Sequence, residues 1–440
     1  MGEIRHQQYQ TWLEACERWR EFEALSASEV QDHQLKELNA QLSYTLANSP
    51  FYSTYWASCP RNVSSLTELS KLPFTTKEDL RGGYPSQFVA AKDSLIIRYG
   101  ESTGTTGLPT SSAITYRDWI LCNVAVEASV GHLFGPADMV FVSIPYELAF
   151  ASYDLDRALE AIGATVVSTG ALTSVCPIDR VAQMMCNVHP AGLICTPTRA
   201  LRIFDMIRDI GEDPRRVGLK TLLYVGETCS SAKLTKIGKM WSVDVATAYG
   251  ATETNSLGLQ CELGQLHLTE DRYIFEVIDP QTGQTVKDGS SGELVVTSIA
   301  TEAMPLIRYR TGDEVTVSPS GSCACGSPRR TIQHHGRLSE GYAVGGRRLN
   351  KLAVEQQVLS TRGTGLYYAA GVEGDQLVVR VQVEEGALVE KTLRSVENSV
   401  SQAFSVPCRA SSVSLSSIMA AMDQMLKPGS LNLEHLRAVE

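Results

Sequence analysis

Several features that would place the chain in a specialised class are absent from its sequence. It has no excess of basic residues: the formal net charge is −10 and the isoelectric point is near 5.4. Nucleic acids and anionic membranes are bound through excess lysine and arginine, so neither partner is expected. The sequence also lacks an N-terminal apolar segment and any apolar run long enough to span a bilayer. These absences predict a cytoplasmic protein without membrane contact.

A disulfide framework is also lacking. The eleven cysteines are odd in number and scattered along the chain, which is typical of free thiols in a reducing compartment. With 440 residues, of which 43% are hydrophobic, the chain can bury a large core. A chain of this length is expected to form two or three domains.

The most distinctive stretch, residues 99–112, consists mainly of glycine and hydroxyl residues. Glycines let the backbone approach a ligand, and successive amide groups and hydroxyls can surround an anion. No Lys-Ser or Lys-Thr follows the last glycine, so the stretch is not a Walker loop. Taken alone it is either a phosphate-binding loop or a polar linker between a strand and a helix. The candidate phosphate contacts are Ser102, Thr103, Gly104, Thr105, Thr106 and Gly107.

Hydrophobic periodicity predicts an α/β fold with a large N-terminal domain. Short apolar runs that predict buried strands lie at residues 139–144, 165–168, 192–195, 221–225 and 243–246. Amphipathic segments between them, such as 179–187 and 198–210, predict helices and therefore mostly parallel sheets. Period-two patterns at 273–278 and 292–298 predict a small antiparallel subdomain. Strands at 366–372 and 376–383 and a helix at 388–404 predict a small α+β domain at the C-terminus.

Four motifs occur in an informative order: Glu101-Ser-Thr-Gly-Thr-Thr-Gly-Leu-Pro109, Tyr249-Gly-Ala-Thr-Glu253, Tyr309-Arg-Thr-Gly-Asp313 and Gly336-Arg337. Their order and spacing resemble those of the adenylate-forming superfamily, which includes acyl-CoA synthetases and peptide-synthetase adenylation domains. The leader at residues 72–81 and a Cys-x-Cys-Gly segment resemble the phenylacetate-CoA ligase branch. This resemblance implies an ATP- and substrate-binding adenylation domain at residues 1–336 and a mobile lid domain at 338–440.

The resemblance also implies roles for single residues. Tyr249 would stack on adenine, Gly250 is a further cofactor-binding residue, Thr252 would contact the α-phosphate, and Glu253 would bind Mg²⁺, a cation that takes oxygen ligands. Asp313 and Arg337 would hold the ribose, and Glu227 is a further nucleotide-binding candidate. Read without the resemblance, Glu253 is an exposed acid at a helix start and Asp313 is a turn residue. The predicted substrate pocket comprises Tyr146, Phe150, Tyr153 and Gly226.

A metal site is predicted from Cys261, His267, Cys323 and Cys325. Three thiolates and an imidazole suffice for tetrahedral Zn²⁺, and all four positions would be protein ligands, as in a structural site. The resemblance supports this interpretation, since some members of the branch have such a set. The alternative is unconnected cysteines and a surface histidine.

The implied reaction converts MgATP and an aromatic carboxylic acid into an acyl-adenylate, and a thiol then displaces AMP. The thiol is coenzyme A or a carrier-protein phosphopantetheine, and the oligomeric state is open. The family's terminal lysine has only Lys427 as a counterpart, in a context that departs from the usual Gly-Lys-x-x-Arg. Two alternatives therefore remain. One is a diazotase of secondary metabolism that activates nitrite for an aryl amine, and the other is a non-catalytic nucleotide-binding homologue.

Overall fold

A computed structural model gives the fold, and it describes residues 2–102, 108–171, 173–423 and 431–439, with side chains from residue 5. The chain divides into two compact units. The first comprises Met1–Val175, Ala191–Leu193 and Ala246–His334, and the second comprises Cys176–Pro190, Ile194–Val245 and His335–Glu440. Three strands run from one unit into the other along the chain: β5 (Gly192–Cys195), β7 (Asp244–Ala251) and β13 (Ile332–Arg337).

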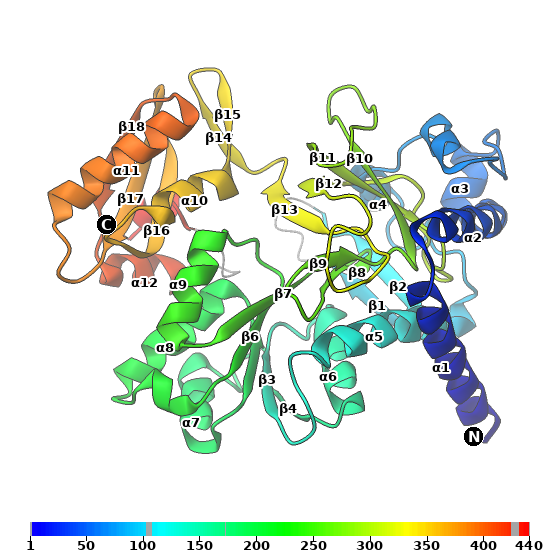
Figure 1. Cartoon of the computed structure of the whole chain (residues 1–440), viewed down its shortest axis with the longest axis horizontal. Helices are drawn as coiled ribbons and strands as arrows, with labels where there is room; N and C mark the ends of the chain where they lie inside the picture. The colour runs from blue at the N-terminus through cyan, green and yellow to red at the C-terminus, as the bar shows by residue number, and fades with distance from the viewer. Residues whose placement is uncertain (1, 103–107, 172, 424–430, 440) are drawn as a thin grey trace. The chain divides into compact units, whose positions relative to one another are not determined.

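The first unit contains helices at its N-terminus and three groups of strands (Figure 1). The helices are α1 (Gly2–Glu23), α2 (Ala27–Asn48), α3 (Pro50–Tyr55), α4 (Lys77–Gly82), α5 (Tyr116–Val130) and α6 (Ala151–Ala161). The strands are β1 (Ile96–Glu101), β2 (Ser111–Thr115), β3 (Met139–Ser143), β4 (Thr165–Ser168), β8 (Asn255–Gln260), β9 (Leu266–Leu268), β10 (Tyr273–Ile278), β11 (Ser291–Ser298) and β12 (Tyr309–Val317).

Capping residues begin several of these helices. Ser26, Thr76 and Thr115 each form a capping box. In each, the hydroxyl accepts a hydrogen bond from the backbone N–H of the third helical residue, and the acidic side chain of that residue accepts one from the backbone N–H of the capping residue. The N-cap of α4 is Thr76 and not its neighbour Thr75. Thr75 is instead buried, and its hydroxyl donates to the carbonyl of Ile307 at 2.7 Å.

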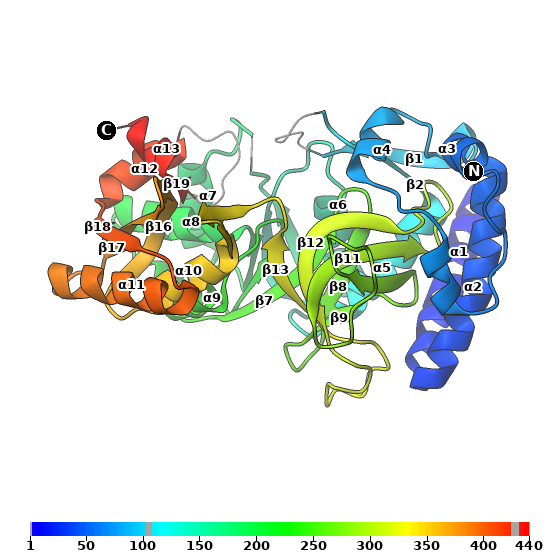
Figure 2. The same cartoon turned by 90° about the horizontal axis from the view of Figure 1, so that it is seen from above.

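The second unit contains an α+β region built on a four-stranded sheet with the order β18-β17-β16-β19. Figure 2 shows α10 and α11 on one side of this sheet and α12 and α13 on the other. The strands of the unit are β6 (Thr221–Tyr224), β14 (Gly341–Val344), β15 (Arg347–Asn350), β16 (Thr364–Glu373), β17 (Gln376–Val383), β18 (Cys408–Ser412) and β19 (Leu431–Asn432). Its helices are α7 (Ile178–Val188), α8 (Pro197–Asp209), α9 (Ser231–Trp241), α10 (Lys351–Ser360), α11 (Val389–Phe404), α12 (Leu415–Asp423) and α13 (Leu433–Arg437).

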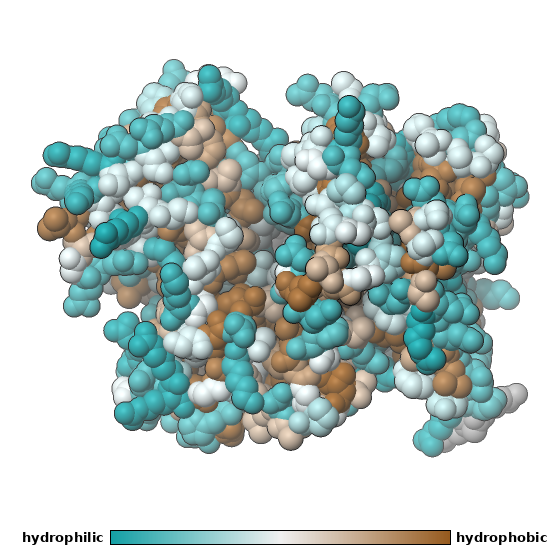
Figure 3. Space-filling model, in the orientation of Figure 1, coloured by the Kyte–Doolittle hydropathy of each residue, from teal (hydrophilic) through white to brown (hydrophobic). Residues whose placement is uncertain are grey.

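Helix α11 illustrates how the sequence pattern orients an element. Its buried residues Thr392, Val396 and Val400 recur at a spacing of four, so one stripe faces the sheet. The side of α11 visible in Figure 3 is mainly hydrophilic. No helix in the described part of the chain combines the length and the apolarity needed to cross a membrane.

The predicted fold class is confirmed. Seven strands, in the order β4-β3-β5-β6-β7-β8-β9, form a sheet in which β3 and β4 are parallel and β7, β8 and β9 are antiparallel neighbours. A separate four-stranded sheet, β10-β11-β12-β13, contains the predicted antiparallel subdomain. The predicted division into residues 1–336 and 338–440 stays a prediction, because residues 335–440 belong to a unit that also includes 194–245.

Candidate functional site

The glycine- and threonine-rich stretch joins β1 to β2, two antiparallel strands. Ser102 and Thr110 close its base. The Ser102 backbone N–H donates to the Thr110 carbonyl at 2.9 Å, and the Thr110 N–H donates to the Ser102 hydroxyl at 2.9 Å. The predicted contacts Thr103, Gly104, Thr105, Thr106 and Gly107 lie outside the described residues. The stretch therefore links two strands, whereas the linker interpretation had placed it between a strand and a helix.

Tyr249 and Asp313, from two separate motifs, are brought together in the first unit. The Tyr249 hydroxyl on β7 donates to Asp313 Oδ2 on β12 at 2.6 Å. Asp313 is 3% exposed, so its carboxylate needs polar partners. Gly250 follows Tyr249, and a Cβ built there would lie 2.2 Å from the Asn255 carbonyl oxygen. Only glycine fits this close approach of the paired strands β7 and β8.

Thr252 and Glu253 lie in the turn between β7 and β8, and both are partly exposed. The hydroxyl of Tyr309 donates to Glu253 Oε1 at 2.6 Å. Tyr309 is 1% exposed and belongs to the same motif as Asp313. The second and third motifs are thus joined by two hydrogen bonds between a tyrosine and a carboxylate, and the sequence did not indicate either bond.

Glu227 lies in the second unit, three residues after the end of β6, and its carboxylate is largely surrounded by protein groups. Its carboxylate accepts from the Thr198 N–H at 3.1 Å and from the Thr198 hydroxyl at 2.7 Å. Lys233 Nζ lies 3.5 Å from Glu227 and 3.7 Å from Glu355. Because Lys233 is only 5% exposed, these contacts form a buried ion cluster. Gly226 has φ 77°, a conformation that favours glycine.

Arg337 is the last residue of β13 and belongs to the second unit, whereas Asp313 belongs to the first. Arg337 helps to line a cavity of about 20 Å³ together with Glu340, Lys351 and Glu355. Lys351 Nζ lies 3.7 Å from Glu340 Oε2. The joint contact of Arg337 and Asp313 with a ribose stays a prediction. Lys427 lies outside the described residues.

Two of the three predicted aromatic pocket residues contact each other in the first unit. Tyr146 and Tyr153 meet edge to face, with ring centroids 5.3 Å apart. The Tyr146 hydroxyl donates to Asp156 at 2.8 Å. Phe150 is 4% exposed, and its ring packs directly against Gly100. A Cβ at position 100 would lie only 2.8 Å from that ring. The sequence did not predict Arg98, whose guanidinium carbon lies 4.0 Å from the centre of the Tyr153 ring.

A buried polar cluster lies beside these aromatics, between α5 and α6. Asn123 Nδ2 donates to Asp154 Oδ1 at 3.1 Å, and the thiol of Cys122 lies 3.9 Å from Asp154 Oδ2. Burial raises the pKa of the Asp154 carboxyl to about 6, against the opposing effects of Trp119, Asn123 and Arg272. Hydrophobic periodicity could not identify Asp154, because it is a charged residue on the buried side of the amphipathic helix α6.

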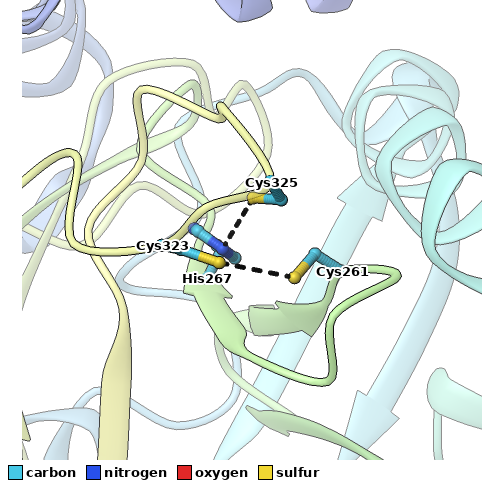
Figure 4. A group of neighbouring side chains, drawn as sticks. All are labelled: Cys261, His267, Cys323 and Cys325. Carbon is cyan, nitrogen blue, oxygen red and sulfur yellow. Dashed lines mark hydrogen bonds between the residues drawn. The ribbon is translucent and has the colours of Figure 1, made fainter.

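The predicted metal ligands converge in the first unit. Figure 4 shows Cys261, His267, Cys323 and Cys325 pointing toward one another, and their ligand atoms all lie within 4.8 Å of each other. Cys261 Sγ and Cys323 Sγ are 3.9 Å apart, and Cys325 Sγ is 3.4 Å from His267 Nε2. Around a tetrahedral Zn²⁺, two sulfurs would be about 3.8 Å apart and a sulfur and a nitrogen about 3.6 Å. The cluster therefore has the ligand types and spacing that could hold zinc.

The backbone explains how ligands from distant segments meet. Cys261 begins a tight turn between β8 and β9, closed by its N–H donating to the Gln265 carbonyl at 2.9 Å. His267 forms an antiparallel bridge with Thr331, which holds the segment of Cys323 and Cys325 against β9. His267 Nδ1 lies 3.0 Å from the Arg329 carbonyl oxygen, so Nε2 is directed to the cysteines. Such a contact to the other ring nitrogen is common around metal-binding histidines.

Comparisons with known proteins agree with the motif order. The family model described as "AMP-binding enzyme" matches residues 24–302. The phenylacetate-coenzyme A ligase of Aromatoleum evansii is 30% identical over 380 residues, which cover 83% of this chain and 84% of that protein. The phenylacetate-coenzyme A ligase of Pseudomonas putida is 30% identical over 350 residues, covering 77% and 78%.

Solved structures show the same fold. A 2-hydroxyisobutyryl-CoA ligase in complex with 2-HIB-AMP superposes with a TM-score of 0.83 at 22% identity, covering 95% of this chain and 92% of that chain. An anthranilate CoA ligase in complex with anthranoyl-AMP superposes with a TM-score of 0.51 at 18% identity, covering 72% and 63%. These likenesses confirm the arrangement of elements.

Proposed function

Because the chain belongs to the AMP-binding enzyme family, we propose that it activates an aromatic carboxylic acid with MgATP and transfers the acyl group to coenzyme A. Membership makes it an acyl-adenylate-forming acid–CoA ligase, and the aromatic nature of the acid is the finer part of the proposal. The observation that carries it is the joining of Tyr249 to Asp313 and of Tyr309 to Glu253 by hydrogen bonds of 2.6 Å.

The first half-reaction forms a mixed anhydride. A carboxylate oxygen attacks the α-phosphorus of ATP, the bond to the β-phosphate oxygen breaks, and pyrophosphate leaves with the electron pair. Ser102 and the following loop would contact the departing phosphates, Thr252 the α-phosphate, and Asp313 and Arg337 the ribose. Glu253 would bind Mg²⁺, which offsets charge developing on the phosphate oxygens. Tyr309 would hold the Glu253 carboxylate in one orientation.

In the second half-reaction a thiol sulfur attacks the acyl carbon. The bond to the phosphate oxygen breaks, AMP leaves, and the thiol proton passes to solvent or to AMP. Relatives named as phenylacetate-coenzyme A ligases support coenzyme A as the thiol. Lys427 would serve the first half-reaction, and Glu227, enclosed by Thr198 and Lys233, would act on the nucleotide only indirectly.

An aromatic acid fits the residues around the predicted pocket. The partly exposed Tyr146 and Tyr153 supply ring surface, which favours flat apolar groups through offset and edge contacts, while the buried Phe150 would act from behind them. Gly226 stays a predicted pocket residue. The names of the relatives support the same substrate class.

We also propose structural Zn²⁺ at Cys261, His267, Cys323 and Cys325. Four protein ligands leave no open position, so the ion would stabilise the fold without taking part in the chemistry. It would tie β9 to the segment that precedes β13.

A panel of aromatic and aliphatic acids tests this proposal. The protein is incubated with MgATP and benzoic, phenylacetic, cinnamic or short aliphatic acids, with and without coenzyme A, and AMP, pyrophosphate and thioester are measured. We expect AMP and thioester in equal amounts with at least one aromatic acid. AMP formation only with nitrite and an aryl amine would support the diazotase instead, and no turnover would support the non-catalytic homologue.

A further inference from the structure

His334 lies against both residues that are proposed to contact the nucleoside. Its ring and the Tyr249 ring are tilted by 41°, with centroids 4.8 Å apart. Its Nε2 lies 3.6 Å from Asp313 Oδ1, while Tyr249 donates to the other oxygen, Oδ2. The side chains of His334 and Asp313 are 16% and 4% exposed. The three residues belong to the first unit and come from β13, β7 and β12.

The arrangement suits a carboxylate that must also receive a ligand. Each carboxylate oxygen can accept about two hydrogen bonds. Tyr249 donates to Oδ2 and His334 Nε2 faces Oδ1 at an ion-pair distance, so the two side chains contact different oxygens of the same carboxylate. A buried carboxylate without such partners is costly and rotates more freely. His334 therefore has a physical role as a partner that holds the Asp313 carboxylate in place.

We propose that His334 is a positioning residue that orients Asp313 toward the ribose hydroxyls and so helps the protein to prefer ribonucleotides over deoxyribonucleotides. The inference deepens the proposed function, on which it rests only for the assignment of Asp313 to the ribose. His334 touches Tyr249 and Asp313, and it acts on the nucleotide through them.

Binding of AMP, measured by titration calorimetry, tests this without any knowledge of the acid. Wild-type protein, His334→Phe and His334→Gln are titrated with AMP and with its analogue that lacks the ribose 2′-hydroxyl. His334→Phe keeps a ring beside Tyr249 but removes the nitrogen that faces Asp313. We expect it to weaken AMP binding about tenfold, since a partner of a buried charge is lost.

The analogue separates positioning from a general loss of structure. If His334 acts through the ribose contact, His334→Phe weakens binding of the deoxy analogue by much less than tenfold, because the two changes affect one interaction and are not additive. His334→Gln, which can still donate toward Asp313, should recover part of the affinity. His6→Gln, at an exposed histidine of α1, is the matched control and should bind both ligands as the wild type does.

Equal losses for AMP and the deoxy analogue would overturn the proposal, as would wild-type affinity in His334→Phe. Failure of the proposed function gives a different signature. In that case no acid supports pyrophosphate release, while the calorimetric comparison between AMP and its analogue is unaffected.

Discussion

At the smallest scale, two tyrosine hydroxyls connect the residues that are proposed to bind the nucleotide. Tyr249 and Tyr309 are each held by a carboxylate, and the carboxylates are those expected to meet the ribose and Mg²⁺. The sequence predicted Tyr249, Glu253 and Asp313 as site residues but could not pair them, because the motifs are far apart along the chain. Tyr309 was visible only as the start of a motif, and its contact with Glu253 needs the tertiary fold.

Replacing Glu253 tests the proposed Mg²⁺ contact. Glu253→Gln keeps the shape and removes the charge, so we expect acid-dependent pyrophosphate release to fall about a hundredfold or more. Tyr309→Phe should cost less, about tenfold, because it removes only the bond that orients the carboxylate. Glu385→Gln, at an exposed glutamate, is the control. Wild-type turnover by a folded Glu253→Gln protein would remove Glu253 from the mechanism.

Asp154 gives the protein a predictable dependence on pH. Its pKa is raised from 3.8 to about 6 in the folded state, so ionisation opposes folding. The stability linked to the protonated carboxyl is fully present below about pH 4 and is lost as pH rises through about 6. Asparagine does not ionise, so Asp154→Asn does not lose this stability. The unfolding free energy of Asp154→Asn minus that of the wild type should therefore rise by up to about 3 kcal/mol between about pH 4 and about pH 7.

Urea denaturation at the two pH values measures this difference. Asp375→Asn, in the exposed turn between β16 and β17, controls for the loss of one carboxyl group. A difference between Asp154→Asn and wild type that stays constant with pH would contradict the raised pKa.

Among the elements, those with strong periodicity were predicted well. The strands at 273–278 and 376–383 coincide with β10 and β17, and α7, α8 and α11 begin and end within one residue of the predicted bounds. The β1–β2 and β14–β15 hairpins were not predicted, since strands of four to six residues beside glycines carry little periodic signal. Helix α5 was also missed, because its residues are buried on most sides and leave no polar stripe.

Helix α9 contains the buried lysine whose removal should be most damaging. Lys233→Met leaves Glu227 and Glu355 without their shared cation, so we expect a loss of about 3–5 kcal/mol of unfolding free energy. Lys239→Met, at an exposed position of the same helix, should have little effect. Adding Glu227→Gln and Glu355→Gln to Lys233→Met should restore much of the stability. A Lys233→Met protein as stable as Lys239→Met would show that the cluster is not stabilising.

The cysteine and histidine cluster that joins β9 to the segment before β13 predicts a bound metal. Elemental analysis of the purified protein should find about one zinc per chain. Cys325→Ser should lose the metal and lower the melting temperature, whereas Cys186→Ser, at a partly buried cysteine of α7, should retain both. Wild-type protein without stoichiometric metal would reduce the four residues to ordinary side chains.

At the scale of the whole molecule, the motif order carried the prediction of an adenylate-forming enzyme, and family membership confirmed the class. The negative net charge argued against nucleic acid and anionic membrane partners, and the length predicted two or three domains, but neither indicated the reaction. The predicted boundary at Arg337 stays a prediction, because the compact units of the structure divide the chain at other positions. The sequence also does not identify the acid, because the predicted pocket residues come from separate segments of the chain.

Transfer of oxygen from the acid to AMP tests the central claim most directly. The protein is supplied with MgATP, coenzyme A and an aromatic acid whose carboxylate oxygens carry a heavy isotope, and the AMP is analysed by mass spectrometry. Attack of the carboxylate on the α-phosphorus, followed by displacement of AMP, predicts one labelled oxygen in each AMP and one in each thioester. AMP without label would contradict the formation of an acyl-adenylate.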